Sequence, residues 1–198
     1  MDDLFKGQMK RIAFDLETLR MKFEKEQFPQ YMVGAGVSVL CAIDMDSNQP
    51  WFFTDRDIGE FGLEKFAQLC TMSELLVSYN GKAFDIPVLS AATEREIPVM
   101  NHVDLYLCIK RALGGYNPKY QKGAWKLDRV GRDTIGVGKL MNDGVYAPQK
   151  WNEGRIGEVS TYCYIDTWLT NMLYKFITEN GYVIDPYGDK ISVDLDPC

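Results

Sequence analysis

The sequence predicts an α/β protein in which a mixed, five-stranded β-sheet is flanked by α-helices. Three strand-like runs come first and follow one another without a helical pattern between them, which is typical of an antiparallel meander. Two further strand-like runs then alternate with helical patterns, which is typical of parallel strands joined by helices. We therefore expect three antiparallel strands followed by parallel ones.

The strands are predicted from short runs that are rich in β-branched and aromatic residues. These runs are Arg11–Leu16, Tyr31–Ile43, Trp51–Thr54, Leu75–Tyr79 and His102–Leu107. A turn-rich stretch, Asp44–Pro50, joins the second and third runs, so we expect a hairpin there.

The helices are predicted from apolar residues at helical spacing. They are Leu63–Met72, Phe84–Glu96, the segment that ends at Leu113, Trp125–Ile135 and Arg155–Asn180, which Gly181 can terminate. We expect Gly114–Gly123 and Asn142–Gln149 to be loops, and the polar tail, residues 182–198, to be a small hairpin or loosely held.

Length and composition indicate one domain over residues 1–198, with its core at about residues 10–180. The chain has no apolar stretch that approaches the length of a membrane span, and it starts without a signal-peptide pattern. Its five cysteines are odd in number and scattered, which is typical of reduced thiols. We expect a cytoplasmic protein with no membrane partner.

The chain has one histidine, His102, and a net charge of −6. A single imidazole excludes metal sites that need two histidines, and it restricts Ser-His-Asp or Cys-His catalysis to that one residue. We expect His102 to be structural and Asp104 to be a candidate for supporting a nearby site. The net negative charge does not by itself suggest a nucleic-acid partner, so any evidence for nucleic-acid binding must come from the sequence motifs.

The first motif is Asp15-Leu16-Glu17, at the end of the first predicted strand. Residues two apart on a strand point the same way, so Asp15 and Glu17 present two carboxylates on one face. A divalent cation is the usual means of stabilising such a pair. The pattern is weak alone, because composition predicts about one Asp-x-Glu by chance, and a solvated strand end explains it equally well.

The second motif is Asn80-Gly81-x-x-Phe84-Asp85, where a buried strand ends in a turn and an aspartate opens a helix. This arrangement places Asp85 at the carboxyl end of a strand, where ligands of α/β sheets bind. The alternative is that Asp85 only caps its own helix, with Pro87 in the first turn.

The third motif is Tyr162-x-x-x-Asp166. Residues four apart share a helical face, and a phenol one turn from a carboxylate can position a water molecule. The alternative is an aromatic core residue beside a surface acid.

Together and in this order, the three motifs resemble those of the 3′–5′ exonucleases of the DnaQ-like, RNase H-like superfamily. They are most similar to the tyrosine (DEDDy) branch, which includes the proofreading domain of family B DNA polymerases. The resemblance implies an RNase H-like fold and two Mg²⁺ or Mn²⁺ ions. It implies that four carboxylates bind the metals, Asp15, Glu17, Asp85 and Asp166, and that Tyr162 orients the attacking water. A sister branch has histidine at the position of Thr161, so the tyrosine branch fits better.

A basic segment, residues 110–139, lies between the second and third motifs. It contains eight basic and two acidic residues, a net charge of +6, with aromatic residues between them. Such a pattern suits single-stranded nucleic acid, although a solvated surface is the alternative. The expected substrate-binding residues are Thr18, Asn80, Lys82, Phe84, Tyr116, Lys119, Lys122, Trp125, Lys126 and Lys139.

The sequence thus predicts a two-metal 3′–5′ exonuclease. Its expected substrate is the 3′ end of single-stranded DNA, with RNA as a second candidate, and its expected products are 5′-mononucleotides. Two alternatives stay open: a structure-selective endonuclease on the same fold, and a catalytically silent nucleic-acid-binding module. A larger replication or repair assembly is a candidate partner.

Overall fold

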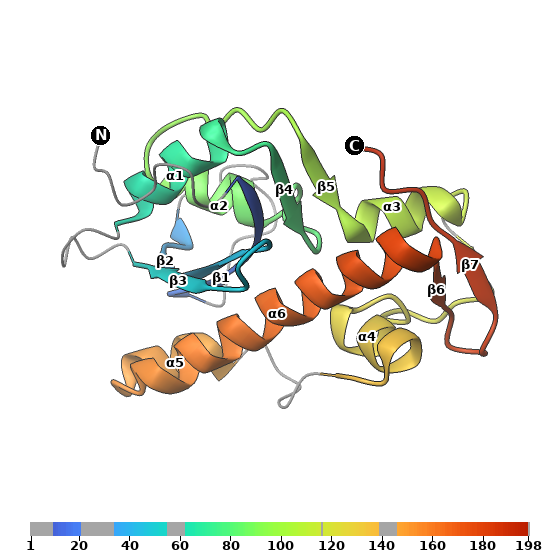
Figure 1. Ribbon diagram of the computed structural model, residues 1–198. Coiled ribbons are helices and arrows are strands. Elements are labelled where there is room, and N and C mark those ends of the chain that lie inside the picture. Colours follow the sequence, from blue (N-terminus) through green and yellow to red (C-terminus); the bar gives the residue numbers. More distant parts are fainter. Residues whose placement is uncertain (1–9, 21–33, 55–61, 116, 139–145, 198) are drawn as a thin grey trace.

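The computed structural model describes residues 10–20, 34–54, 62–115, 117–138 and 146–197. Its centre is a five-stranded sheet with the strand order β3-β2-β1-β4-β5 (Figure 1). The strands are β1 (Arg11–Thr18), β2 (Val37–Asp44), β3 (Pro50–Phe53), β4 (Leu75–Ser78) and β5 (His102–Asp104). The first three pair antiparallel, whereas β1 with β4 and β4 with β5 pair parallel. This confirms the predicted mixed sheet.

Alternate residues of β1 pack into different cores on the two faces of the sheet. Ile12, Phe14 and Leu16 face the core that is covered by α1 (Leu63–Met72) and α2 (Asp85–Ala92). On the opposite face, Ala13 belongs to a second core that includes Leu169 and Leu173 of α6 (Ile156–Asn180), the long helix in Figure 1. Because side chains alternate along a strand, Asp15 and Glu17 are on the α6 side with Ala13.

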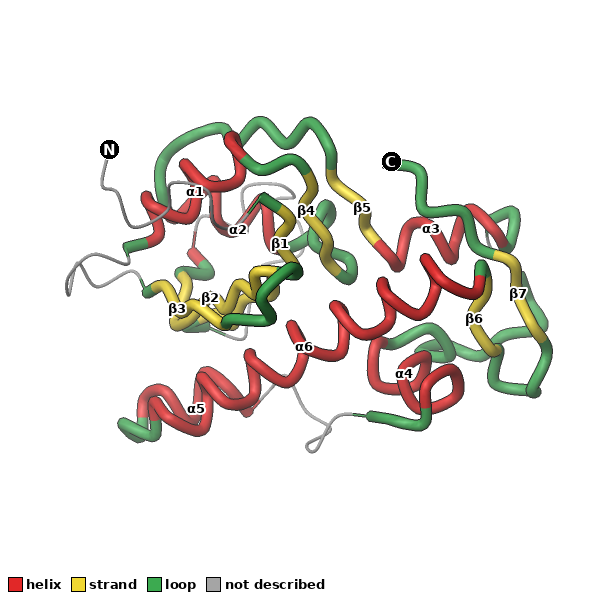
Figure 2. The backbone as a smooth tube through the Cα atoms, in the orientation of Figure 1, coloured by secondary structure: helices red, strands yellow, loops and turns green. Residues whose placement is uncertain are grey.

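The second core extends beyond the sheet at the C-terminal end of α6. There α6 packs against α4 (Leu127–Ile135), and residues of α3 (Leu105–Ala112) join the same cluster. The tail forms a hairpin of β6 (Tyr182–Ile184) and β7 (Lys190–Ser192), which lies at this end of the molecule in Figure 2. Of the two expectations for the tail, the hairpin is confirmed.

The predicted loop at Asn142–Gln149 is wrong where the structure describes it, because α5 (Tyr146–Asn152) is a helix. Pro148 is tolerated in the first turn, where its missing N–H has no intrahelical partner. Ala147 and Trp151 are buried with Val159 and Tyr162 of α6, and this packing stabilises a short helix that local sequence does not favour. Residues 139–145 lie outside the described part.

Several predicted boundaries also differ from the structure. The second strand starts at Val37; Gly36 precedes it with φ +58°, and a Cβ there would lie 2.8 Å from Cδ1 of Leu19. The run His102–Leu107 leaves the strand after Asp104, which caps α3 by accepting hydrogen bonds from the N–H groups of Tyr106 and Leu107. No helix in the described ranges is long and apolar enough to cross a membrane.

Candidate metal centre

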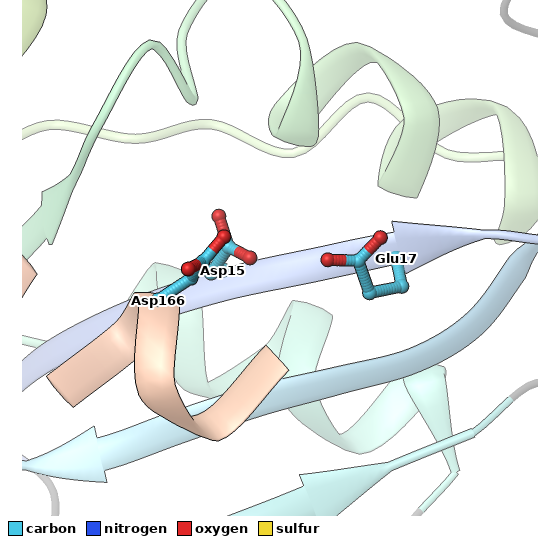
Figure 3. Close-up of side chains that lie close together, drawn as sticks. All are labelled: Asp15, Glu17 and Asp166. Carbon is cyan, nitrogen blue, oxygen red and sulfur yellow. The ribbon is translucent and has the colours of Figure 1, made fainter. Parts of the chain in front are cut away.

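Three carboxylates meet between β1 and α6. Asp15 and Glu17 project from β1 and Asp166 projects from α6, and one oxygen of each lies within 4.8 Å of the others (Figure 3). Glu17 and Asp166 are buried and Asp15 is half-buried. The structure therefore brings together two predicted site residues from the first motif and one from the third.

Residues on both sides of Asp166 fix the contact between α6 and the sheet. The thiol of Cys163 donates to the carbonyl oxygen of Asp15 at 3.3 Å, and Thr167 Oγ1, which donates to the carbonyl oxygen of Cys163 at 2.8 Å, also lies 3.4 Å from the carbonyl oxygen of Cys41 on β2. Burial raises the pKa of Cys163, with the negative charge of Asp15 adding to the shift, so the thiol stays protonated and able to donate. These contacts hold Asp166 against the strand that carries Asp15 and Glu17.

Asp85 reaches the same region from the carboxyl end of β4. It is the first residue of α2, it is only 4% exposed, and its Oδ1 accepts a hydrogen bond from the N–H of Leu16 at 3.1 Å. The alternative that Asp85 caps its own helix is therefore wrong: the N-cap position is Phe84, and no side chain caps α2. The β1–β4 pairing ends at Ala13 and Val77. Beyond that point the Asp85 carboxylate, and not a β4 carbonyl, accepts the hydrogen bond of the Leu16 N–H.

The charge on Asp85 interacts with that of Asp166 in the cluster. Burial raises the pKa of Asp85 to about 7, the N–H of Leu16 opposes this shift, and the negative charges of Asp104 and Asp166 add to it. Ionising all these carboxylates without a cation is costly in a buried site.

The donor set fits a hard divalent cation such as Mg²⁺ or Mn²⁺, which prefers carboxylate oxygens. Three oxygens that lie within 4.8 Å of one another can converge on one ion through small side-chain rotations. Asp85 stands close enough for its pKa to respond to the charge of Asp166. The four carboxylates are therefore a candidate metal centre.

Tyr162 is one helical turn from Asp166 and is only 8% exposed. Part of it lines an open hollow of about 590 Å³ beside the first turns of α6. The other lining residues are Gly154, Arg155, Ile156, Gly157, Glu158, Thr161 and Ile165. Tyr162 therefore lies at the wall of this hollow, one helical turn before Asp166 in the sequence of α6.

The basic segment is largely engaged within the protein. Lys119 pairs with Asp185 at 3.2 Å and with Asp189 at 3.0 Å, which ties its loop to the β6–β7 hairpin. The half-buried Trp125 packs against the second core, and its carbonyl oxygen accepts a hydrogen bond from Tyr79 at 2.6 Å. Hence Lys119 and Trp125, both expected to bind substrate, have internal contacts that anchor this loop.

Two other basic residues of the segment face outward. Lys122 and Lys126 are exposed and line a hollow of about 410 Å³ together with Tyr120, Arg129 and Tyr187. Tyr116 and Lys139 lie outside the described residues.

The remaining predicted substrate-binding residues lie at the ends of β1 and β4. Thr18 Oγ1 donates to the carbonyl oxygen of Arg20 at 3.0 Å, and Phe84 packs half-buried against the first core. Asn80 adopts a left-handed conformation with φ +67°, and the N–H of Lys82 donates to Asp104 at 3.0 Å.

Asp104 has a larger part in this region than sequence reasoning gave it. Its carboxylate accepts backbone hydrogen bonds from Asn80 and Lys82 as well as from the start of α3. His102 is fully buried and its Nε2 lies 2.7 Å from Oγ of Ser78. The preference of aspartate for helix N-caps could have identified the α3 contacts of Asp104. No local sequence signal marks its bonds to the Asn80–Lys82 turn.

Comparisons with known proteins agree with this architecture. A model of the RNase_H superfamily matches residues 12–178. Among solved structures, the family B DNA polymerase from the hyperthermophilic archaeon Pyrobaculum calidifontis is similar, with a TM-score of 0.61 and 18% sequence identity. The similarity covers 84% of this chain and 24% of that polymerase, so the chain spans about a quarter of its length. No curated protein matches the chain.

Proposed function

The chain belongs to the RNase H superfamily, and on that premise we propose that it is a metal-dependent 3′–5′ exonuclease. The proposed substrate is the 3′ end of single-stranded DNA, with RNA as a second candidate, and the proposed products are 5′-mononucleotides. The observation that carries the proposal is the convergence of Asp15, Glu17 and Asp166 within 4.8 Å, with Asp85 beside them.

In this proposal Asp15, Glu17, Asp85 and Asp166 would hold two divalent ions. Two such ions, when bound, would supply an activated water and stabilise negative charge on the phosphate. We assign to the hydroxyl of Tyr162 the role of orienting that water, and its position one helical turn from Asp166 supports the assignment. Neither a histidine nor a thiol is needed for this chemistry.

The substrate strand would meet the site where β1 and β4 end. Thr18, Asn80, Lys82 and Phe84 lie there, and Lys122 and Lys126 are two of the exposed basic residues of the 110–139 segment that could offer charge to phosphates. We further propose that residues 1–198 form one exonuclease domain, that it acts in the cytoplasm, and that a replication or repair assembly is its setting.

The test is a product ladder from a 5′-labelled single-stranded oligonucleotide, in DNA and RNA forms, with Mg²⁺, Mn²⁺ or EDTA. We expect stepwise shortening from the 3′ end that requires metal and is abolished in Asp15→Ala. Glu179→Ala, an exposed acid on α6, is the matched control and should keep full activity. Full activity in Asp15→Ala would overturn the assigned site.

Two further measurements separate the alternatives. An oligonucleotide blocked at its 3′ end should resist an exonuclease, whereas internal cleavage of it would favour a structure-selective endonuclease. Calorimetry with Mn²⁺ tests the silent binding module: absence of metal binding at millimolar concentration would favour that module over an enzyme.

A further inference from the structure

The position of Asp85 depends on the turn that precedes it. Asn80 begins this turn in a left-handed conformation, and the N–H of Gly81 donates to Oγ of Ser78 at 3.2 Å. A Cβ at Gly81 would lie 2.3 Å from the same oxygen and 3.3 Å from Oδ2 of Asp85. The turn is therefore packed directly between the end of β4 and the Asp85 carboxylate.

His102 on β5 fixes the Ser78 hydroxyl from the other side. Its Nε2 lies 2.7 Å from Ser78 Oγ, and its fully buried ring packs against Phe14, whose neighbour in the chain is Asp15. The other ring nitrogen, Nδ1, is buried and has no hydrogen-bond partner among the described residues. The polar contact of the ring is thus directed at Ser78, and in either tautomer it holds the oxygen that receives the Gly81 N–H.

Asp104 stands two residues farther along β5, on the same face as His102. Its Oδ1 accepts the N–H of Asn80 at 2.8 Å, and its Oδ2 accepts the N–H of Lys82 at 3.0 Å. Side chains of β5 therefore hold three successive N–H groups of the turn: Asn80 and Lys82 directly through Asp104, and Gly81 through Ser78 and His102.

We propose that His102 is a positioning residue that sets the place of Asp85 relative to Asp15 and Asp166: through Ser78 it clamps the Asn80–Lys82 turn, which Asp104 also holds. The inference rests on the proposed function in so far as Asp85 is taken to be a metal ligand. In a purely structural role, His102 would only fill space behind Phe14. In the proposed role, loss of its bond to Ser78 displaces the Asp85 carboxylate.

The experiment compares Ser78→Ala, His102→Phe and His102→Gln with Val103→Ala, a buried control on the same strand. The first readout is hydrogen exchange at the Leu16 amide, measured by NMR without metal, because that amide donates to Asp85. The second is Mn²⁺ binding, measured by calorimetry. The glutamine variant serves as a rescue, since its amide nitrogen takes the place of Nε2.

We expect Ser78→Ala and His102→Phe to accelerate exchange at Leu16 and to weaken binding of the more loosely held Mn²⁺ by about tenfold. His102→Gln should restore both properties at least in part, and Val103→Ala should leave both as in the wild type. If folded Ser78→Ala exchanges its Leu16 amide hydrogen at the wild-type rate, the inference is overturned. The same variant provides the test if His102→Phe does not fold.

The exchange readout needs neither metal nor substrate, so it separates this inference from the proposed function. If the wild-type protein fails to shorten oligonucleotides, the exonuclease proposal is overturned. The clamp would then still be tested by the rate of hydrogen exchange at the Leu16 amide. An active enzyme with unchanged Leu16 exchange in Ser78→Ala would overturn only the clamp.

Discussion

The Asp85 carboxylate accepts a hydrogen bond from the backbone N–H of Leu16 at 3.1 Å, although 69 residues separate them in the chain. Leu16 lies between Asp15 and Glu17, so this bond joins the second acidic motif to the first. The carboxylate also has a structural role. The β1–β4 pairing ends before Leu16, so without Asp85 the N–H of Leu16 would be left without this hydrogen-bond partner. Asp85 is therefore both a candidate ligand and a connection between strands.

Replacing Asp85 with asparagine tests how much a buried charge destabilises the metal-free protein. Burial raises the pKa of Asp85 to about 7, from about 3.9 in an unfolded chain. A raised folded-state pKa contributes stability that is present below about pH 4 and is lost as the pH rises through 7. In EDTA, Asp85→Asn should therefore raise the free energy of unfolding at pH 8, by as much as about 4 kcal/mol, and much less at pH 5.

Urea denaturation at both pH values measures this effect. The comparison between variant and wild type cancels the contribution of His102, whose pKa is lowered by burial to about 3 and which acts in the opposite direction. Asp46→Asn, an exposed substitution, should change stability equally at the two pH values. A gain in Asp85→Asn that is the same at pH 5 and pH 8 would contradict the prediction.

Replacing Tyr162 with phenylalanine removes one hydroxyl and keeps the buried ring. If the hydroxyl orients the attacking water, kcat should fall by about 10²-fold while KM for the oligonucleotide and Mn²⁺ affinity stay close to wild type. Tyr164→Phe, on the same helix and half-buried, is the control and should retain activity. Steady-state kinetics decide the matter, and an unchanged kcat would remove Tyr162 from the proposed mechanism.

Two glycines should respond to alanine in opposite ways. At Gly81 the added Cβ meets Ser78 Oγ at 2.3 Å, so Gly81→Ala should lower the free energy of unfolding by about 1–3 kcal/mol. At Gly157, on the first turn of α6, nothing lies within 4 Å, so Gly157→Ala should raise it by about 0.5 kcal/mol through helix propensity. Thermal and urea unfolding give both values, and equal effects would show that the turn has room to relax.

The fold and the pairing of residues within each acidic motif could be predicted from the sequence because their signals are local, whereas the meeting of the motifs was predicted from their resemblance to the exonuclease family. Asp15 and Glu17 are two apart on a strand and Tyr162 and Asp166 are four apart on a helix, so regular geometry fixes the face that each pair shares. The meander and the alternating strands and helices predict the mixed antiparallel and parallel pairing of the sheet in the same way.

The supporting contacts could not be predicted, because they join residues that no periodic pattern links. The bonds Ser78–His102 and Lys119–Asp185 span 24 and 66 residues. Lys119 is an example. Its positive charge predicts phosphate binding, but in the structure Lys119 forms an ion pair with the buried side chain of Asp185. The helix α5 was missed for a similar reason, since the buried Trp151 stabilises it through tertiary packing.

The exposed lysines of the basic segment give the last prediction. Lys122 and Lys126 line one hollow with Tyr120 and Tyr187 and point their charge outward. If a single strand crosses this hollow, Lys122→Glu combined with Lys126→Glu should raise KM for long oligonucleotides about tenfold. The slope of log affinity against log salt should also decrease by about 1.4, because two phosphate contacts are lost.

The matched control is the double variant Lys10→Glu and Lys175→Glu, which changes the net charge equally. Lys10 immediately precedes β1, and Lys175 donates a hydrogen bond to Asn48 in the β2–β3 turn. Both therefore lie near the N-terminal end of β1, whereas Asp15 and Glu17 are near its C-terminal end. Binding titrations over a range of salt concentrations, together with kinetics on long and very short oligonucleotides, distinguish the two variants. Identical salt slopes would mean that the hollow lies off the path of the strand and that net charge alone attracts the substrate.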